Sequence, residues 1–467
     1  MTDGLVSRRF AKTSGIAGVC LAIMSFQANA QVAPAGSVKK VVNSKIAVDV
    51  DGGWGIYQGP QATASSLFDF QNNALLGVKT LNYSTQLGLI FNVTGVVFAP
   101  CPVAAAPVHC TTNTAGQVGM GLGFGQVTFG PGGEAGGWIT DNTQTVHLTN
   151  PNQTPGTISA VAVDATNGAY AVGYELTSTD FQKHAVVWRL DSTNHTYVPV
   201  SRTDLGTLGG LISQALGISK NARYIVGTAN TAANKAHAVY ALNTDIGWTD
   251  ISAGLPAGLL KSQAWVASDT GFIAGTASVN RLVGGKLKPV TIGFVYNTAD
   301  SSTKVFEAPG YNVTPLQVLS DGRVVGNLES VTNAKAAHPF LFDGSNLVDF
   351  GVMTLASTGQ PAFGCRVTRP NSLGELVGSC IPNGTMLYGS LGTGFYLNAV
   401  AASPAFIDVN AVLHASSDSN TTGLKGYNVG FVAAIDDQHE ITVNTSRTIS
   451  GVVATQAFVA AKVAYNP

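Results

Sequence analysis

DLGTLGG at residues 204–210, followed by SQALGISKNARYIVGTANTAANKAHAVYAL at 213–242, is the stretch that decides the fold. It contains three segments in which apolar residues alternate with others, separated by Gly-, Asn- and Ser-containing turns, and the third segment opens at His237. Period-two alternation bounded by turn residues is typical of antiparallel strands joined by hairpins. The stretch therefore predicts three short strands and no helix.

The turn inside this stretch recurs along the chain. Seven copies align on it, and consecutive copies lie 49 to 64 residues apart. Because Gly in a tight hairpin supplies a positive φ, each copy is predicted to be a hairpin turn. The turn positions are Gly116, Gly168, Ala222, Gly271, Gly322, Gly374 and Gln438. A fixed period of this length indicates one structural unit that is repeated.

Each unit also contains a third predicted strand about a dozen residues after the β-branched run that follows the turn, and several contain a short fourth one. Third strands include HAVVW at 184–188 and HAVYA at 237–241, and fourth strands include LVDFG at 347–351. Four short antiparallel strands per unit, with no helical periodicity between units, are typical of a propeller blade. We predict an all-β fold, a β-propeller with seven recognisable four-stranded blades over residues 112–467.

DLGTLGG, the S-x-A-x-G-I segment, the V-G after the turn and the strand that opens His-Ala together resemble the HAF repeat family of probable extracellular proteins. The resemblance is strongest in the third unit and looser over the rest of 112–467. It implies a β-propeller outside the cytoplasm, and it implies no catalytic residues. The residues that define the repeat here are Asp204, Gly206, Gly209, Gly210, Gly227 and His237.

Residues 31–111 leave two alternatives open. They form an eighth, diverged blade, or they supply a strand that closes the ring against the last unit together with an elaboration held by Cys101–Cys110. Ring closure removes exposed sheet edges, which promote aggregation. The C-terminal segment QAFVAAKVAYNP is a candidate partner for such a closing strand.

Residues 1–30 are predicted to be a signal peptide. Basic residues at positions 8, 9 and 12 precede a short apolar run at 13–26, and Ala28-Asn29-Ala30 has the small-x-small pattern of a cleavage site. Cleavage between Ala30 and Gln31 predicts a secreted or periplasmic protein. No later apolar run is long enough for a transmembrane anchor in the mature chain.

Cysteine usage agrees with export, because four cysteines remain after the signal peptide. The favoured pairing is local, Cys101 with Cys110 and Cys365 with Cys380. The midpoint of the second pair lies within the turn at 370–374, so two strands folding back on that turn would bring both cysteines opposite each other. Structural disulfides are favoured over a zinc or thiol site, because the spacing does not fit zinc.

No residue is assigned to catalysis, to a metal or to a cofactor. DVDGGWG at 49–55 lacks the Glu that a calcium loop needs at position twelve, where Pro60 stands. The Gly-rich 119–137 lacks the helix and Lys of a phosphate loop. His184, His237 and His338 occupy equivalent positions, either as ligands converging on a central channel or, as we favour, as strand-opening side chains that bond a neighbouring backbone or turn group.

Charge argues against nucleic acid as a partner, because the formal net charge is −1 and no Lys/Arg cluster exists in the sequence. The leading hypothesis is a non-enzymatic extracellular protein that binds a glycan or protein ligand through long inserts such as 276–291 and 379–392. The first alternative is a propeller enzyme, which would place histidines beside a carboxylate in the central channel. The second is a structural envelope or matrix protein.

Overall fold

The computed structural model describes residues 156–411, except 165, 178–180, 192–198, 369 and 387–391, together with 428–435; strands β1–β8, β30 and β31 are described by their backbone. The predicted signal peptide, its cleavage site at Ala30 and Gln31, and the Cys101–Cys110 pair lie outside these residues. In the described part of the chain, no helix is long and apolar enough to cross a bilayer.

Five four-stranded antiparallel sheets form the centre of the fold, and in each sheet the strands are hydrogen-bonded in the order of the sequence. The first two are β9 (Gly156–Asp164), β10 (Gly168–Leu176), β11 (Lys183–Leu190), β12 (Pro199–Asp204) and β13 (Gly209–Ile218), β14 (Tyr224–Thr231), β15 (Ala236–Leu242), β16 (Thr249–Asp250). The next two are β17 (Lys261–Ala267), β18 (Phe272–Val283), β19 (Lys286–Asn297), β20 (Ser302–Phe306) and β21 (Tyr311–Val318), β22 (Val324–Ser330), β23 (Ala337–Phe342), β24 (Leu347–Asp349). The fifth is β25 (Gly364–Val367), β26 (Glu375–Ile381), β27 (Thr393–Asn398), β28 (Phe406–Asp408). The predicted third strands coincide with β11, β15, β19, β23 and β27.

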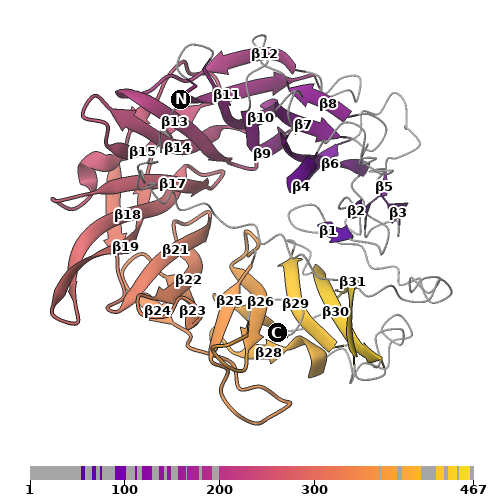
Figure 1. Cartoon of the computed structure of the whole chain (residues 1–467). Helices are drawn as coiled ribbons and strands as arrows, with labels where there is room; N and C mark the ends of the chain where they lie inside the picture. Colours follow the sequence, from indigo (N-terminus) through magenta and orange to yellow (C-terminus); the bar gives the residue numbers. More distant parts are fainter. Residues whose placement is uncertain are drawn as a thin grey trace, which may run out of the picture.

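The five sheets follow one another around a common centre (Figure 1). The first strand of each sheet is innermost, and β9, β13, β17 and β21 contact their neighbours in turn. Each first strand also contacts the third strand of the preceding sheet, as β13 contacts β11. This meander topology and radial arrangement are those of propeller blades, so the fold is all-β and built from blade-like repeats.

Three further sheets flank these five. One contains β4 (Ile90–Pro100), β6 (Val118–Thr128), β7 (Gly136–Thr140) and β8 (Thr145–Leu148), with β5 (Thr111–Thr112) paired to β6. Another contains β29 (Asn428–Ile435), β30 (Glu440–Ile449) and β31 (Val452–Lys462). A small, separate sheet contains β1 (Trp54–Tyr57), β2 (Ser66–Asp69) and β3 (Ala74–Leu75). Its strand β1 contacts β31 but does not pair with it.

The repeating turn lies between the first and second strand of each of the five sheets. All five of its described central residues have a positive φ, as the hairpin interpretation requires. They are Gly168 (92°), Ala222 (56°), Gly271 (89°), Gly322 (87°) and Gly374 (86°). In the third unit alanine thus adopts the left-handed conformation that glycine adopts in the others.

The glycine at the V-G position has a different role, which is close backbone approach. A Cβ added at Gly227 would overlap the carbonyl oxygen of Gln214 on the first strand, nearer than real Cβ atoms come. The equivalent glycines Gly173, Gly275, Gly326 and Gly378 would overlap a first-strand carbonyl in the same way. In four of the five sheets the first strand has a register shift at this point, for example between Ala215 and Gly217. The recurring V-G therefore allows each bulged first strand to cross its second strand closely.

The core lies between adjacent sheets rather than inside any one of them. Val172 and Val187 of one sheet pack with Ile225 and Ala241 of the next, all at most 5% exposed. Buried polar atoms also join the sheets. Ser213 Oγ accepts a hydrogen bond from the Ala185 N–H at 2.9 Å, and the equivalent Ser262 Oγ accepts one from the Ala238 N–H at 2.8 Å.

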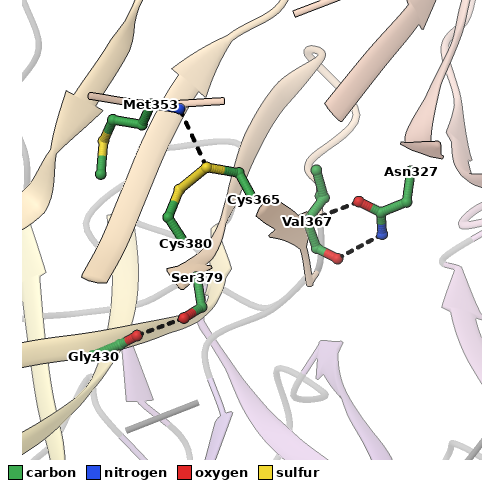
Figure 2. Close-up of a disulfide and its surroundings, with 7 residues drawn as sticks. All are labelled: Asn327, Met353, Cys365, Val367, Ser379, Cys380 and Gly430. Atoms are coloured by element: carbon green, nitrogen blue, oxygen red, sulfur yellow. Dashed lines mark hydrogen bonds between the residues drawn. A yellow bond between two sulfur atoms is a disulfide. The ribbon is translucent and has the colours of Figure 1, made fainter. Parts of the chain in front are cut away.

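A disulfide joins Cys365 and Cys380, which are directly opposite each other in the β25–β26 pair. Both cysteines are fully buried. Figure 2 shows hydrogen bonds that join this sheet to both of its neighbours. The Asn327 side chain bonds the backbone of Val367 at 2.8 and 2.9 Å, and Ser379 Oγ donates to the Gly430 carbonyl at 2.7 Å.

Candidate functional site

The two faces of the ring are defined by which strand connections they carry. The long-loop face carries the connections from each second to each third strand and from each fourth strand to the next sheet, including 251–260, 350–363 and 382–392. The short-turn face carries the first-to-second and third-to-fourth connections, for example 219–223 and 343–346.

The most prominent element of the long-loop face is the β18–β19 hairpin. The insert at 276–291, which the sequence indicates as a place for a binding surface, forms a hairpin: β18 and β19 pair continuously from Phe272↔Asn297 to Val283↔Lys286 around the two-residue turn at 284–285. Gly-Gly is a typical two-residue connection of a tight hairpin, which explains why the strands continue to this point. The second predicted insert, 379–392, begins as the end of β26 and continues as a loop that lies partly outside the described residues.

Exposed large apolar side chains gather on the long-loop face. Of the eleven in the described part of the chain, six lie there, two (Ile246 and Leu373) lie on the short-turn face, and three (Val200, Val305 and Val348) lie on the fourth strands. The six are Phe181, Leu211, Leu260, Leu282, Leu287 and Phe363. They come from four of the five sheets, so the apolar character belongs to the face as a whole.

The acidic side chains of the long-loop face are mostly paired with bases. Arg202 binds the buried Glu175, with its Nε 2.8 Å from the carboxylate, and Arg281 binds Glu307 at 3.0 Å. Arg366 binds Glu329. Burial raises the pKa of Glu175, and the Arg202 guanidinium acts in the opposite direction. Four exposed lysines on this face form no ion pair with a described residue: Lys235, Lys261, Lys286 and Lys288.

Each of the three repeated histidines bonds an aspartate on the fourth strand of its own sheet. The Nδ1 to carboxylate distances are 3.0 Å for His184–Asp204, 2.7 Å for His237–Asp250 and 3.0 Å for His338–Asp349. The histidines were predicted to bond a neighbouring backbone or turn group, and this partner is wrong. Each of them bonds a carboxylate. The third and fourth strands lie side by side, so this carboxylate is the nearest strong acceptor.

The same aspartates also hold the connection that leads to the next sheet. Asp204 Oδ1 accepts from the Gly206 N–H at 2.8 Å, and Asp349 Oδ1 accepts from the Gly351 N–H at 2.7 Å. Gly206 has φ of +65°, a left-handed turn that favours glycine. DLG at 204–206 therefore holds the connection that follows the fourth strand. Gly209 and Gly210 are the first two residues of β13 in the next sheet.

The three His–Asp pairs do not meet at one site. Each lies in a different sheet, on the third and fourth strands, and the third strand is about 10 Å outward from the first because strands are about 4.8 Å apart. The histidines therefore lie beside carboxylates but not along the innermost strands. His414 and His439, the other two histidines that the enzyme alternative would bring to the channel, lie outside the described residues. Among the described residues, no group of three or more metal-ligating side chains occurs.

We expect the His338–Asp349 pair to stabilise the fold in a pH-dependent way. Burial alone would raise the pKa of Asp349, but hydrogen bonds from His338 and from the Gly351 N–H outweigh it and hold this pKa below its ordinary value. A lowered carboxyl pKa stabilises the folded state above the unfolded pKa of about 3.9, and this contribution is lost as pH falls through the folded pKa. Asp349→Asn should therefore cost about 1 kcal/mol at pH 7 and much less near pH 3, measured by urea denaturation.

The matched control for this prediction is Asp408→Asn. Asp408 accepts from the Asn410 N–H at 2.9 Å, but Thr393 occupies the position of the histidine in that sheet. The control should show a smaller loss at pH 7. A cost for Asp349→Asn that is the same at both pH values would contradict the pairing.

Comparison with known proteins bears on the fold alone. No family model and no curated protein matches this chain. Solved structures to which it is similar include the β-propeller domain of the trilobed protease from Pyrococcus furiosus, at 9% identity and a TM-score of 0.40, covering 72% of this chain and 93% of that one. Prolyl oligopeptidase B from Galerina marginata is similar at 9% identity and a TM-score of 0.41, covering 75% and 48%. TolB from Acinetobacter baumannii is similar at 11% identity and a TM-score of 0.33, covering 72% and 73%.

Proposed function

We propose that this protein is an exported, non-enzymatic binding protein that recognises a glycan or protein ligand through its long-loop face. The observation that carries the proposal is the gathering of six exposed large apolar side chains on that face. Large exposed apolar patches mark sites of contact with other molecules, and we propose that these six side chains contribute to such a site. Connections held on a rigid scaffold are also where binding residues usually lie.

Export and family form part of the same proposal. The basic and apolar pattern of residues 1–30 supports export, and DLGTLGG with its following strands supports membership of the HAF repeat type. We also propose seven blades, because the β4–β8 and β29–β31 sheets occupy the positions of the first and last sequence copies.

The enzyme alternative has less support, because the His–Asp pairs belong to separate sheets and each is engaged in its own connection. A structural envelope role would leave the long-loop face without a specific ligand. Binding measurements distinguish this role from the proposed one.

The proposal is tested by screening the purified protein on glycan and protein arrays and then measuring affinity for the ligand found. Leu211→Ser combined with Phe363→Ser should weaken binding about tenfold or more, because both apolar side chains lie exposed on the long-loop face. Ile246→Ser combined with Leu373→Ser on the short-turn face is the matched control and should leave affinity unchanged. Binding of no ligand would favour the structural alternative, and an equal loss in both variants would place the site elsewhere.

A further inference from the structure

The β18–β19 hairpin extends well beyond the sheet to which it belongs. β17 ends its pairing with β18 at Lys261↔Ser278, and β20 pairs only with the other end of β19. Residues 279–283 therefore continue about 16 Å past the sheet edge at about 3.3 Å per residue. The base of this extension is anchored, because Ala277, Val279 and Ile292 pack with Leu255 and Leu259 of the preceding connection.

The tip of the hairpin has one apolar and one basic face. Leu282 and Leu287 are cross-strand partners and are 75% and 67% exposed. Cross-strand partners point to the same face of a two-stranded ribbon, and neighbours along the strand point to the opposite one. The two leucines thus form one exposed apolar pair, while Lys286 and Lys288 lie on the other face.

The charge of the tip is uniformly positive. No acidic residue occurs between Asp269 and Asp300 in the sequence, a stretch that contains the entire hairpin. Glu307 is bonded to Arg281 at 3.0 Å, which leaves both tip lysines without an acidic partner among the described residues. An occupant of this surface must accept two aliphatic side chains and bring negative charge.

We infer that the hairpin tip docks on an anionic phospholipid surface, with Leu282 and Leu287 entering the acyl boundary and Lys286 and Lys288 held at the headgroups. Apolar side chains flanked by lysines suit such an interface, where the aliphatic part is buried and the ammonium stays at the anionic headgroup level. A protein partner fits less well, because interface hot spots are rich in Trp, Tyr and Arg, whereas Leu is under-represented and Lys depleted. The inference does not depend on which ligand the rest of the long-loop face binds.

The test is cosedimentation of the purified full-length protein with vesicles of phosphatidylcholine alone and with vesicles that also contain phosphatidylglycerol. The protein should bind the anionic vesicles preferentially. Leu282→Ser combined with Leu287→Ser should reduce the partition coefficient about tenfold or more. Lys286→Gln combined with Lys288→Gln should reduce it at low salt, and the difference from the wild type should shrink in high salt.

The matched control is Ile246→Ser, which removes an 89% exposed apolar side chain from the short-turn face and should leave vesicle binding unchanged. All variants change exposed tip or surface residues, and unchanged thermal melting verifies that each is folded. Equal binding to neutral and anionic vesicles, or undiminished binding by the leucine variant, would overturn the inference. If the tip variants lose affinity for a glycan or protein ligand and the wild type binds no vesicles, the tip contacts that ligand instead. This result would overturn the membrane inference and leave the proposed function standing.

Discussion

Replacing Gly227 by Ala should lower the free energy of unfolding by about 3 kcal/mol. The new Cβ would overlap the carbonyl oxygen of Gln214 and also come to 3.0 Å from the Ala215 Cα. These are backbone atoms, and β14 is hydrogen-bonded to β13 on one side and to β15 on the other, so neither strand can move alone. The measurement is urea denaturation of the wild type and the variant.

Gly258→Ala is the control for this prediction. Gly258 has φ of +80° and nothing within 4 Å of an added Cβ, so its substitution costs only the left-handed backbone strain of about 1 kcal/mol. Gly326→Ala should behave like Gly227→Ala, because its Cβ would overlap the Thr314 carbonyl in the same way. If Gly227→Ala were no worse than the control, the close crossing of first and second strands would be disproved.

Removing the Cys365–Cys380 disulfide should cost about 3 kcal/mol, the cross-linking contribution for a loop of about 15 residues. The variant is Cys365→Ala combined with Cys380→Ala. It also removes the Sγ that accepts a hydrogen bond from the Met353 N–H at 3.3 Å (Figure 2). Thermal or urea unfolding under oxidising conditions measures the difference.

Reductant provides the internal control. With reductant present throughout unfolding, the wild type loses the cross-link in its unfolded state, and its advantage over the double variant should fall to the packing contribution of the two side chains. Equal stability of the two proteins under oxidising conditions would show that the disulfide does not form in solution.

The strands could be predicted because each repeat shows the same local pattern of alternating apolar residues and turn residues. The segment that opens at His237 becomes β15, and the turn at Ala222 becomes the positive-φ hairpin, since alternation and turn residues are local signals. The disulfide between Cys365 and Cys380 follows from the same symmetry about the turn. These features depend on residues that are close in sequence.

The partner of each histidine could not be predicted in the same way. His184 and Asp204 are 20 residues apart, and only the pairing of third and fourth strands brings them together. The sequence does contain a signal for this aspartate. The fourth strand repeatedly ends in Asp, and the residue two positions later donates its N–H to that carboxylate, as in Asp204–Gly206 and Asp349–Gly351. The 276–291 hairpin was not predicted, although Gly-Gly is a typical two-residue hairpin connection.

No sequence motif predicts the proposed binding surface on the long-loop face, because its exposed apolar side chains come from separate sheets. Leu211 is the third residue of the first strand β13, and Phe363 immediately precedes the first strand β25, 152 positions later in numbering. Neither is unusual in its local context. Only the radial arrangement of the sheets places them on one face.

A crystal structure of the protein tests the central claim, that one unit of four consecutive strands is repeated around a ring with its exposed apolar side chains on one face. We expect each sheet to contain its strands in the order first to fourth, a second-strand glycine such as Gly227 to lie against a first-strand carbonyl, and Leu211, Leu282 and Phe363 to be exposed on the same side. Strands of one unit shared between different sheets, or these three side chains on opposite sides, would contradict it.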